Sequence, residues 1–221
     1  RRHASTATTA SFTMTRLRRT LTRTALWLAL GMTNAFADAT EDLKRFFSET
    51  SSYTAEFEQV VVDETGAEID RSGGMFWIER PGRFRWEYSR PSEQIIVGTG
   101  ESIWIYDVEL EQATQRRSAD AISRTPAALL AGEGELEANF SIEAIGRHEG
   151  LDRVAMRPRD TDVGFNEIRI GFRDGRLAVL ELRDAFDQTT RMQFSGVQEN
   201  IDIPAERFAF TPPAGIDVIV E

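Results

Sequence analysis

The chain has 221 residues, of which 41% are hydrophobic and 28% charged, a composition that is ordinary for a globular protein and argues against a disordered chain or a multi-span membrane protein. Its formal net charge of -10 is an average over two unlike parts. Residues Arg1–Ala37 contain six arginines and no acidic residue, so the remaining 184 residues hold 20 of the 26 basic side chains against all 36 acidic ones, a net charge of -16. A chain this acidic repels a phosphate backbone, which argues strongly against nucleic acid as a partner.

The basic N-terminal segment, Arg1–Ala37, has the layout of an export signal. From Met14 a run of arginines precedes a short apolar stretch, Ala25–Met32, and Ala35-Phe36-Ala37 places small residues around a bulky one, as a signal peptidase requires. The apolar stretch is far too short to anchor the chain across a bilayer. We therefore expect a signal peptide over residues 14–37, cleaved after Ala37, with Arg1–Thr13 upstream of the true start. A basic amphipathic helix in the cytoplasm is the alternative.

The chain contains no cysteine. A disulfide framework is therefore excluded, and the exported domain must be stabilised by its own core, which 184 residues can supply. No cysteine follows the cleavage site to carry a lipid. We expect a single domain, residues 38–221, that is soluble in the bacterial periplasm.

Residue periodicity predicts one helix followed by a series of strands. Asp38 can cap a helix in which Leu43, Phe46 and Phe47 share one face. The period then changes to two, which is typical of strands. Turn signals separate five runs rich in aromatic and β-branched residues: Tyr53–Val62, Gly74–Glu79, Arg83–Tyr88, Gln94–Val97 and Ser102–Asp107.

A second predicted helix interrupts these strands. Thr125-Pro126 combines a cap with a proline at a helix start, and Ala127–Ala131, which includes Leu129 and Leu130, favours helix. The fold class is therefore mainly β, with about ten or eleven antiparallel strands, because Phe208–Phe210 could add an edge piece. Five strands are expected after the helix, with a tight Arg173-Asp174-Gly175 turn before the fourth: Phe140–Ile145, Arg153–Arg157, Glu167–Phe172, Leu177–Arg183 and Thr190–Val197.

Residues suited to catalysis are scarce. Without cysteine there is no thiolate nucleophile, and no serine stands in a Gly-x-Ser-x-Gly elbow. The predicted exported domain has one histidine, His148, which we expect to be a solvated loop residue. Glu56 and Glu58 could in principle form a glycosidase pair, but on an alternating strand we expect them on the solvent face. We expect no enzyme activity, no metal site and no cofactor.

Aromatic and aliphatic side chains are more abundant than one packed sheet face needs. In Arg83–Tyr88 the alternation predicts that Phe84, Trp86 and Tyr88 face inward, whereas Ser102–Asp107 is apolar on both faces. A closed eight-stranded barrel is filled by its own side chains, but an unclosed one leaves an apolar cavity that helices must cover. The pattern alone leaves both a plain packed core and a covered cavity open.

Residues 77–86 read WIERPGRFRW, which follows the pattern Trp-x-x-Arg-Pro-x-x-Phe-x-Trp. This pattern is similar to the signature of the periplasmic lipoprotein carrier family LolA, and three further segments resemble that family in the same order. The resemblance covers essentially all of Asp38–Val218 and implies an incomplete (unclosed) antiparallel β-barrel with a helical lid over a hydrophobic cavity. The other matching segments are Tyr53–Gln59, Ile103–Asp107 followed by Glu111–Ala113, and Phe208–Pro213 followed by Gly215.

The same resemblance implies which residues form the site. Arg80, the arginine of the signature, is expected to latch the lid by hydrogen bonding, although from the residues alone it also fits an exposed arginine at a strand end. Five aromatic residues are expected to line the cavity and its mouth: Phe84, Trp86, Phe57, Trp77 and Trp104. Five residues are expected on the lid helices: Leu43, Phe46, Phe47, Leu129 and Leu130.

The function implied by the resemblance is that of a soluble periplasmic carrier, expected to be a monomer. It would shield the acyl chains of lipoproteins and pass them from an inner-membrane ABC-type lipoprotein-releasing complex to an outer-membrane receptor lipoprotein. The alternative is a periplasmic stress-sensing or lipid-binding module on the same half-barrel scaffold, which is not an enzyme either.

Overall fold

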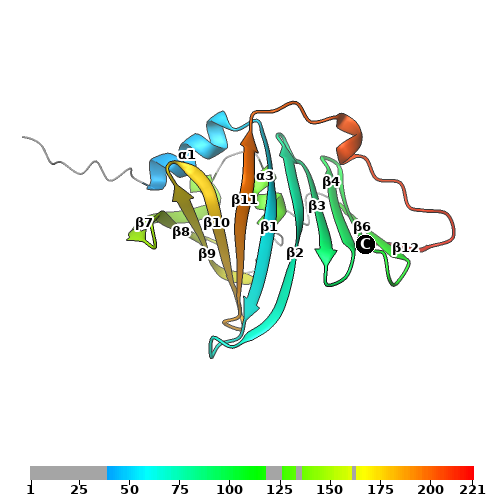
Figure 1. Ribbon diagram of the computed structural model, residues 1–221, viewed down its shortest axis with the longest axis horizontal. Coiled ribbons are helices and arrows are strands. Elements are labelled where there is room, and N and C mark those ends of the chain that lie inside the picture. Colours follow the sequence, from blue (N-terminus) through cyan, green and yellow to red (C-terminus); the bar gives the residue numbers. More distant parts are fainter. Residues whose placement is uncertain (1–38, 118–125, 133–135, 161–162) are drawn as a thin grey trace, which may run out of the picture. The chain divides into compact units, whose positions relative to one another are not determined.

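The computed structural model describes residues 39–117, 126–132, 136–160 and 163–221, all of which belong to one compact unit over residues 36–221. The described part is mainly β (Figure 1). The expected signal peptide and its cleavage site, together with Asp38 and Thr125, lie outside the described residues.

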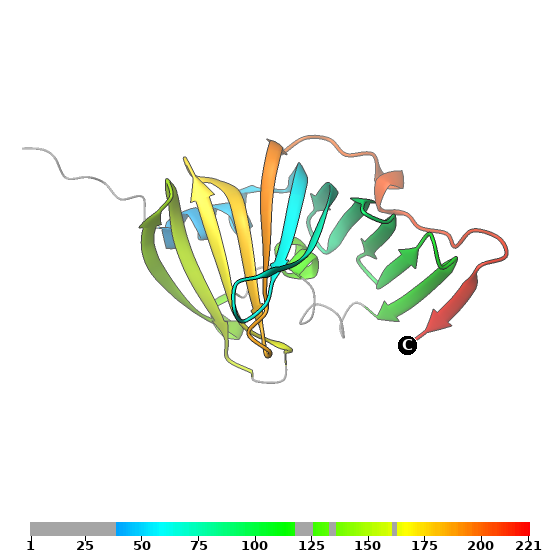
Figure 2. The ribbon, with the colours of Figure 1, turned by 60° about the horizontal axis from the view of Figure 1, so that its bottom comes forward.

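In the part of the chain that the structure describes, twelve strands form a single sheet in the order β12-β6-β5-β4-β3-β2-β1-β11-β10-β9-β8-β7. Neighbouring strands are antiparallel, apart from the parallel pair of β12 and β6. Because β7 and β12 lie at opposite edges and do not pair, the sheet is an unclosed barrel (Figure 2). The strands are β1 (Ser52–Val62), β2 (Glu68–Glu79), β3 (Arg83–Arg90), β4 (Gln94–Thr99), β5 (Ser102–Asp107), β6 (Gln112–Arg117), β7 (Phe140–His148), β8 (Leu151–Pro158), β9 (Phe165–Arg173), β10 (Arg176–Asp184), β11 (Thr189–Glu199) and β12 (Asp217–Val220).

The ten strands expected from periodicity are all present, and two more join them. β6 (Gln112–Arg117) is largely polar, so its sequence carries little strand signal, and β12 (Asp217–Val220) pairs with it at the edge. Phe208–Phe210 does not add an edge strand. Phe208 instead ends a short 3-10 helix, η1 (Ala205–Phe208), where its side chain is buried. The turn expected at Asp174-Gly175 is confirmed, with positive φ at both residues.

Within the described residues, three α-helices lie against the sheet. α1 (Ala39–Glu49) contacts strands β7 to β10, and α3 (Pro126–Ala131) contacts β2 and β3. α4 (Leu136–Asn139) leads directly into β7. α1 and α3 therefore cover different halves of the same face of the curved sheet (Figure 1).

Strand register places the core on the face covered by these helices, which we call the inner face. Residues directly opposite each other on paired strands point to the same side of a sheet. Phe76 pairs with Trp86 and Ile78 with Phe84, and all four are buried. At the other half of the sheet the buried residues Val154, Ile170, Leu180 and Met192 form one continuous row across β8 to β11.

Candidate functional site

Arg80 directly follows β2 and joins both lid helices to the sheet. Its Nη1 donates a hydrogen bond to the carbonyl of Phe46 at 3.1 Å and another to the carbonyl of Thr50. Its Nη2 donates to the carbonyl of Leu130 in α3 at 2.8 Å. The last carbonyls of a helix have no partner inside the helix, and the planar guanidinium fork can reach several of them at once. One side chain thus holds the end of α1 and the end of α3 together.

The surroundings of Arg80 are apolar on one side. Its guanidinium carbon lies 4.6 Å from the ring centroid of Phe46 and 4.9 Å from that of Phe47, which are cation–π distances. Burial lowers the pKa of Arg80 to about 10, so the group is still charged at neutral pH. Within the described residues its hydrogen-bond partners are backbone carbonyls and no carboxylate pairs with it. The hydrogen bonds of Arg80 therefore depend on the ends of α1 and α3 and break when those helices move away from it.

The lid residues predicted from the sequence pack into the core. Leu43, Phe46, Leu129 and Leu130 are buried, and Phe47 is partly buried against the same cluster. The Phe46 ring makes an edge contact with that of Phe47, at 5.4 Å between centroids, and with that of Tyr53 at 5.8 Å. Both helices thus place apolar side chains on the inner face, as an amphipathic cover does.

Phe57, Phe84 and Trp86 lie together on this inner face. Ring centroids are 5.0 Å apart for Phe57 and Trp86, and 4.3 Å apart for Phe76 and Trp86. All of these side chains are buried, so the interior beneath the lid is filled by aromatic and aliphatic groups. Phe76 and Tyr53 belong to the same cluster, although the sequence reasoning did not select them. The alternation of side chains along β2, aligned with that along β3, is the sequence signal that could have identified Phe76.

Trp77 and Trp104 are placed differently from the expectation that they line the cavity. Trp77 pairs with Arg85 and Trp104 with Val97, so both point to the outer face of the sheet. The C-terminal segment covers them there. The Arg207 guanidinium carbon lies 4.6 Å from the Trp77 ring centroid, and the Phe210 and Trp104 centroids are 5.4 Å apart. These tryptophans therefore pack a second apolar layer, separate from the lid side.

Residues considered for catalysis are all at the surface. Glu56 and Glu58 are exposed on the outer face, and His148 is exposed as the last residue of β7 rather than in a loop. The described ranges contain no group of three or more potential metal ligands. None of the helices in these ranges has the length and hydropathy needed to cross a membrane.

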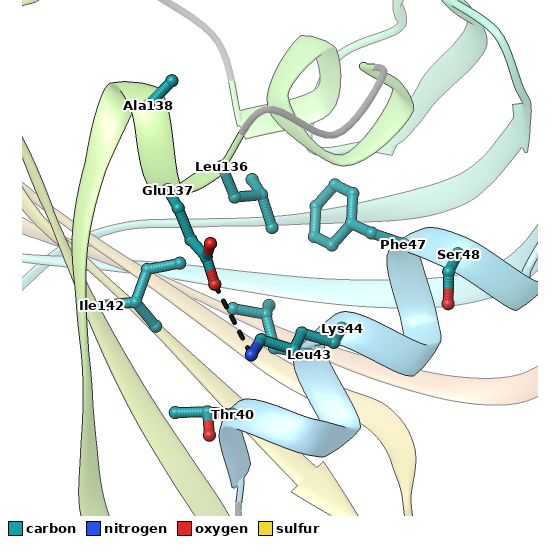
Figure 3. A pocket seen from close by; sticks show the side chains of 9 residues that line it. All are labelled: Thr40, Leu43, Lys44, Phe47, Ser48, Leu136, Glu137, Ala138 and Ile142. Atoms are coloured by element: carbon teal, nitrogen blue, oxygen red, sulfur yellow. Dashed lines mark ion pairs between the residues drawn. The ribbon is translucent and has the colours of Figure 1, made fainter.

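A groove opens beside the lid, between α1 on one side and α4 and β7 on the other (Figure 3). Its volume is about 810 Å³, within the range of small-molecule sites. Leu43, Phe47, Leu136 and Ile142 give it an apolar floor, and all four also pack against the core. The Lys44 ammonium and the Glu137 carboxylate meet across its mouth at 3.5 Å. The groove is thus an apolar extension of the covered interior that reaches the surface.

Comparison with known proteins places the chain in a family. The family model described as outer membrane lipoprotein carrier protein LolA matches residues 48–211. This chain belongs to the LolA family. An outer-membrane lipoprotein carrier protein from Dechloromonas aromatica is 44% identical over 187 residues, covering 85% of this chain and 90% of the relative. Another from Methylococcus capsulatus is 43% identical over 176 residues, covering 80% and 85%.

A solved structure of an uncharacterized conserved protein from Thermus thermophilus has the same fold, with a TM-score of 0.54 at 12% identity, covering 83% of this chain and 99% of that one. The LolA match includes Arg80, the inner-face aromatic residues and α3, together with the greater part of the sheet. The LolA family is one of carrier proteins, so the expectation that the chain is not an enzyme agrees with its membership.

Gly98 controls the position of Phe84 in this LolA interior. It lies opposite Phe84 on β4, and a Cβ at this position would be 2.3 Å from Cε1 of the Phe84 ring. We expect Gly98→Ala to displace this buried ring and to lower the free energy of unfolding by about 1–3 kcal/mol, as overpacking does. Denaturant midpoints measure the loss. Gly171→Ala is the control, since its nearest neighbour is Leu151 Cδ1 at 3.2 Å, and equal losses in the two variants would contradict the prediction.

Proposed function

We propose that this protein is a periplasmic carrier that encloses the acyl chains of lipoproteins between its sheet and its lid helices. The observation that carries the proposal is the position of Arg80, which fastens two separate helices over the apolar inner face of an unclosed sheet. Relatives of this protein are named outer-membrane lipoprotein carrier proteins, which supports the same proposal.

The physical problem of such a carrier is to replace the apolar surroundings of a membrane. An acyl chain loses about 0.8 kcal/mol per methylene when it is moved from apolar surroundings into water. The inner-face cluster of Phe57, Phe76, Phe84 and Trp86 offers equivalent surroundings once the lid moves away. When cargo leaves, the same side chains and the Arg80 hydrogen bonds close the interior again. Closure therefore supplies part of the free energy of release.

The groove between α1 and α4 offers cargo a route to this interior. Its apolar floor is continuous with the core, and an exposed ion pair between Lys44 and Glu137 crosses its mouth. Exposed ion pairs of this kind contribute only about 0–1 kcal/mol, so the pair is a weak barrier to opening.

The proposal extends to location and partners. The export signal expected at residues 14–37 would deliver the domain, residues 38–221, to the periplasm as a monomer. There it would receive acylated lipoproteins from an inner-membrane ABC-type lipoprotein-releasing complex and pass them to an outer-membrane receptor lipoprotein. Nucleic acid is not a partner in this proposal. A stress-sensing module on the same scaffold is not favoured, because the matching family and relatives are carriers.

A binding experiment with a synthetic lipopeptide tests the carrier function. We expect the purified protein to form a stable complex with a triacylated lipopeptide and none with the same peptide lacking acyl chains, since burial of hydrocarbon against the apolar inner face drives the binding. Co-elution in size-exclusion chromatography, with the lipopeptide fluorescently labelled, measures the complex. Failure to bind the acylated peptide, or equal binding of both peptides, would contradict the proposed function.

A further inference from the structure

Trp86 carries a buried hydrogen-bond donor that is not used. Its side chain is only 2% exposed, and its indole Nε1 is buried with no hydrogen-bond partner among the described residues. A buried indole N–H normally finds a partner, and leaving one without a partner costs free energy. Within the inner-face cluster of Phe57, Phe76, Phe84 and Trp86, this N–H is the polar side-chain group that the structure leaves unsatisfied.

This donor lies where the interior changes from apolar to polar. Along the inner face of β3 the order is Phe84, Trp86, Tyr88. The Trp86 ring packs against Phe57 and Phe76 and is stacked with Tyr88, at 6.3 Å between centroids and 22° between planes.

A chain of hydrogen bonds begins at Tyr88. The Tyr88 hydroxyl donates to Gln59 Oε1 at 3.1 Å, and Gln59 Nε2 donates to Ser72 Oγ at 3.1 Å. Burial raises the pKa of Tyr88, and the nearby negative charge of Asp70 is a smaller cause of the same shift. The hydroxyl therefore stays protonated and donates its hydrogen bond to Gln59. The indole N–H of Trp86 is thus the free donor at this boundary within the part of the chain that the structure describes.

We propose that the indole N–H of Trp86 hydrogen-bonds a carbonyl oxygen of the ester or amide group that joins an acyl chain to its lipoprotein. This inference rests on the proposed carrier function and names the polar contact within it. A carbonyl drawn into an apolar interior loses its hydrogen bonds to water, so it binds well only where a donor replaces them. The indole N–H is a donor without acceptor capacity, which matches a carbonyl oxygen.

The geometry assigns each part of the acyl group a position. The hydrocarbon lies against Phe76, which is directly opposite Trp86, and against Phe84, the next inward-facing residue of β3 toward Arg80. The carbonyl lies at Trp86, and the remainder of the linkage extends toward the polar chain of Tyr88, Gln59 and Ser72. Trp86 therefore sets how deeply an acyl chain enters, and it favours acyl chains over plain alkyl chains.

A pair of diacyl lipopeptides with a free α-amino group tests this contact, the two chains being ester-linked in one and ether-linked, at equal length, in the other, so that no amide-linked acyl chain supplies a second carbonyl. The ether lacks the carbonyl but keeps the hydrocarbon. We expect the purified protein to bind the ester form about five- to tenfold more tightly, as one buried hydrogen bond predicts. Trp86→Phe removes the N–H and keeps an aromatic ring, so the ratio of ester to ether affinity should fall to about one, whatever the variant does to the affinity for the ether form. Isothermal titration calorimetry measures both affinities.

Trp104→Phe is the matched control, because Trp104 lies on the outer face and its loss should leave the ratio unchanged. A direct readout is the Trp86 indole resonance in ¹⁵N-labelled protein, which should shift downfield with the ester lipopeptide and not with the ether one. This measurement needs no variant and is therefore independent of how Trp86→Phe folds. Equal binding of ester and ether, or a preference that survives in Trp86→Phe, overturns the inference and leaves the carrier function intact. If neither lipopeptide binds, both the Trp86 contact and the proposed carrier function are overturned.

Discussion

Arg80→Leu should take up acylated cargo and fail to release it. The substitution removes all hydrogen bonds to the carbonyls of Phe46, Thr50 and Leu130, but leaves an apolar side chain beside Phe46 and Phe47. The empty, closed state is then less stable relative to the loaded state, in which the lid is displaced. Since release is driven partly by closure, its rate and extent should both decrease.

The size of this effect follows from the charge on Arg80. A hydrogen bond to a charged group contributes about 1.5–3 kcal/mol, and about 1.4 kcal/mol corresponds to a factor of ten. Losing even one such bond should therefore slow release at least about tenfold. Transfer of a fluorescent triacylated lipopeptide from the preloaded protein to acceptor liposomes measures the rate.

Arg83→Leu is the control for the loss of a nearby arginine. Arg83 pairs with Glu79 at 2.6 Å and lies over the Phe208 ring, so among the described residues its ion pair and ring contact both lie away from the lid helices. Its variant should release cargo at the normal rate. If Arg80→Leu released cargo as fast as Arg83→Leu, the fastening of the helices by Arg80 would have no part in the transfer cycle.

Gly74→Ala should have the largest effect on folding. Gly74 lies where β2 is irregular against β3, and a Cβ there would be 1.7 Å from the backbone carbonyl oxygen of Glu87. A backbone atom in a paired strand cannot move aside without breaking the pairing. We expect the free energy of unfolding to fall by about 3 kcal/mol or more, at the upper end of the cost of overpacking. Urea denaturation followed by circular dichroism measures this loss.

The neighbouring Gly73→Ala provides a matched comparison. Its Cβ would meet the end of the flexible Arg90 side chain at 2.7 Å and the Phe57 carbonyl oxygen at 3.0 Å, so most of the strain can be relieved by moving Arg90. The expected loss is about 1 kcal/mol or less. Similar losses in the two variants would show that β2 and β3 do not approach each other as closely at Gly74 as the structure describes.

Features that depend on neighbouring residues could be derived from the amino-acid sequence. The alternation of Phe84, Trp86 and Tyr88 on β3 fixes which side chains share a face, because side chains alternate along any strand. The turn at Asp174-Gly175 follows from the ease with which these residues adopt positive φ. The spacing of Leu43, Phe46 and Phe47 likewise predicted the apolar face of α1.

The positions of Trp77 and Trp104 and the hydrogen-bond partners of Arg80 depend instead on how distant segments pack in the fold. Strand periodicity separates two faces but cannot say which is covered when both are apolar, and here the outer face is covered by Arg207 and Phe210, far along the chain. The partners of Arg80 come from α1 and α3, 30 to 50 residues away in either direction. Periodicity reports the polarity of a segment, whereas burial depends on which distant segment packs against it, and that is set only when the whole chain folds.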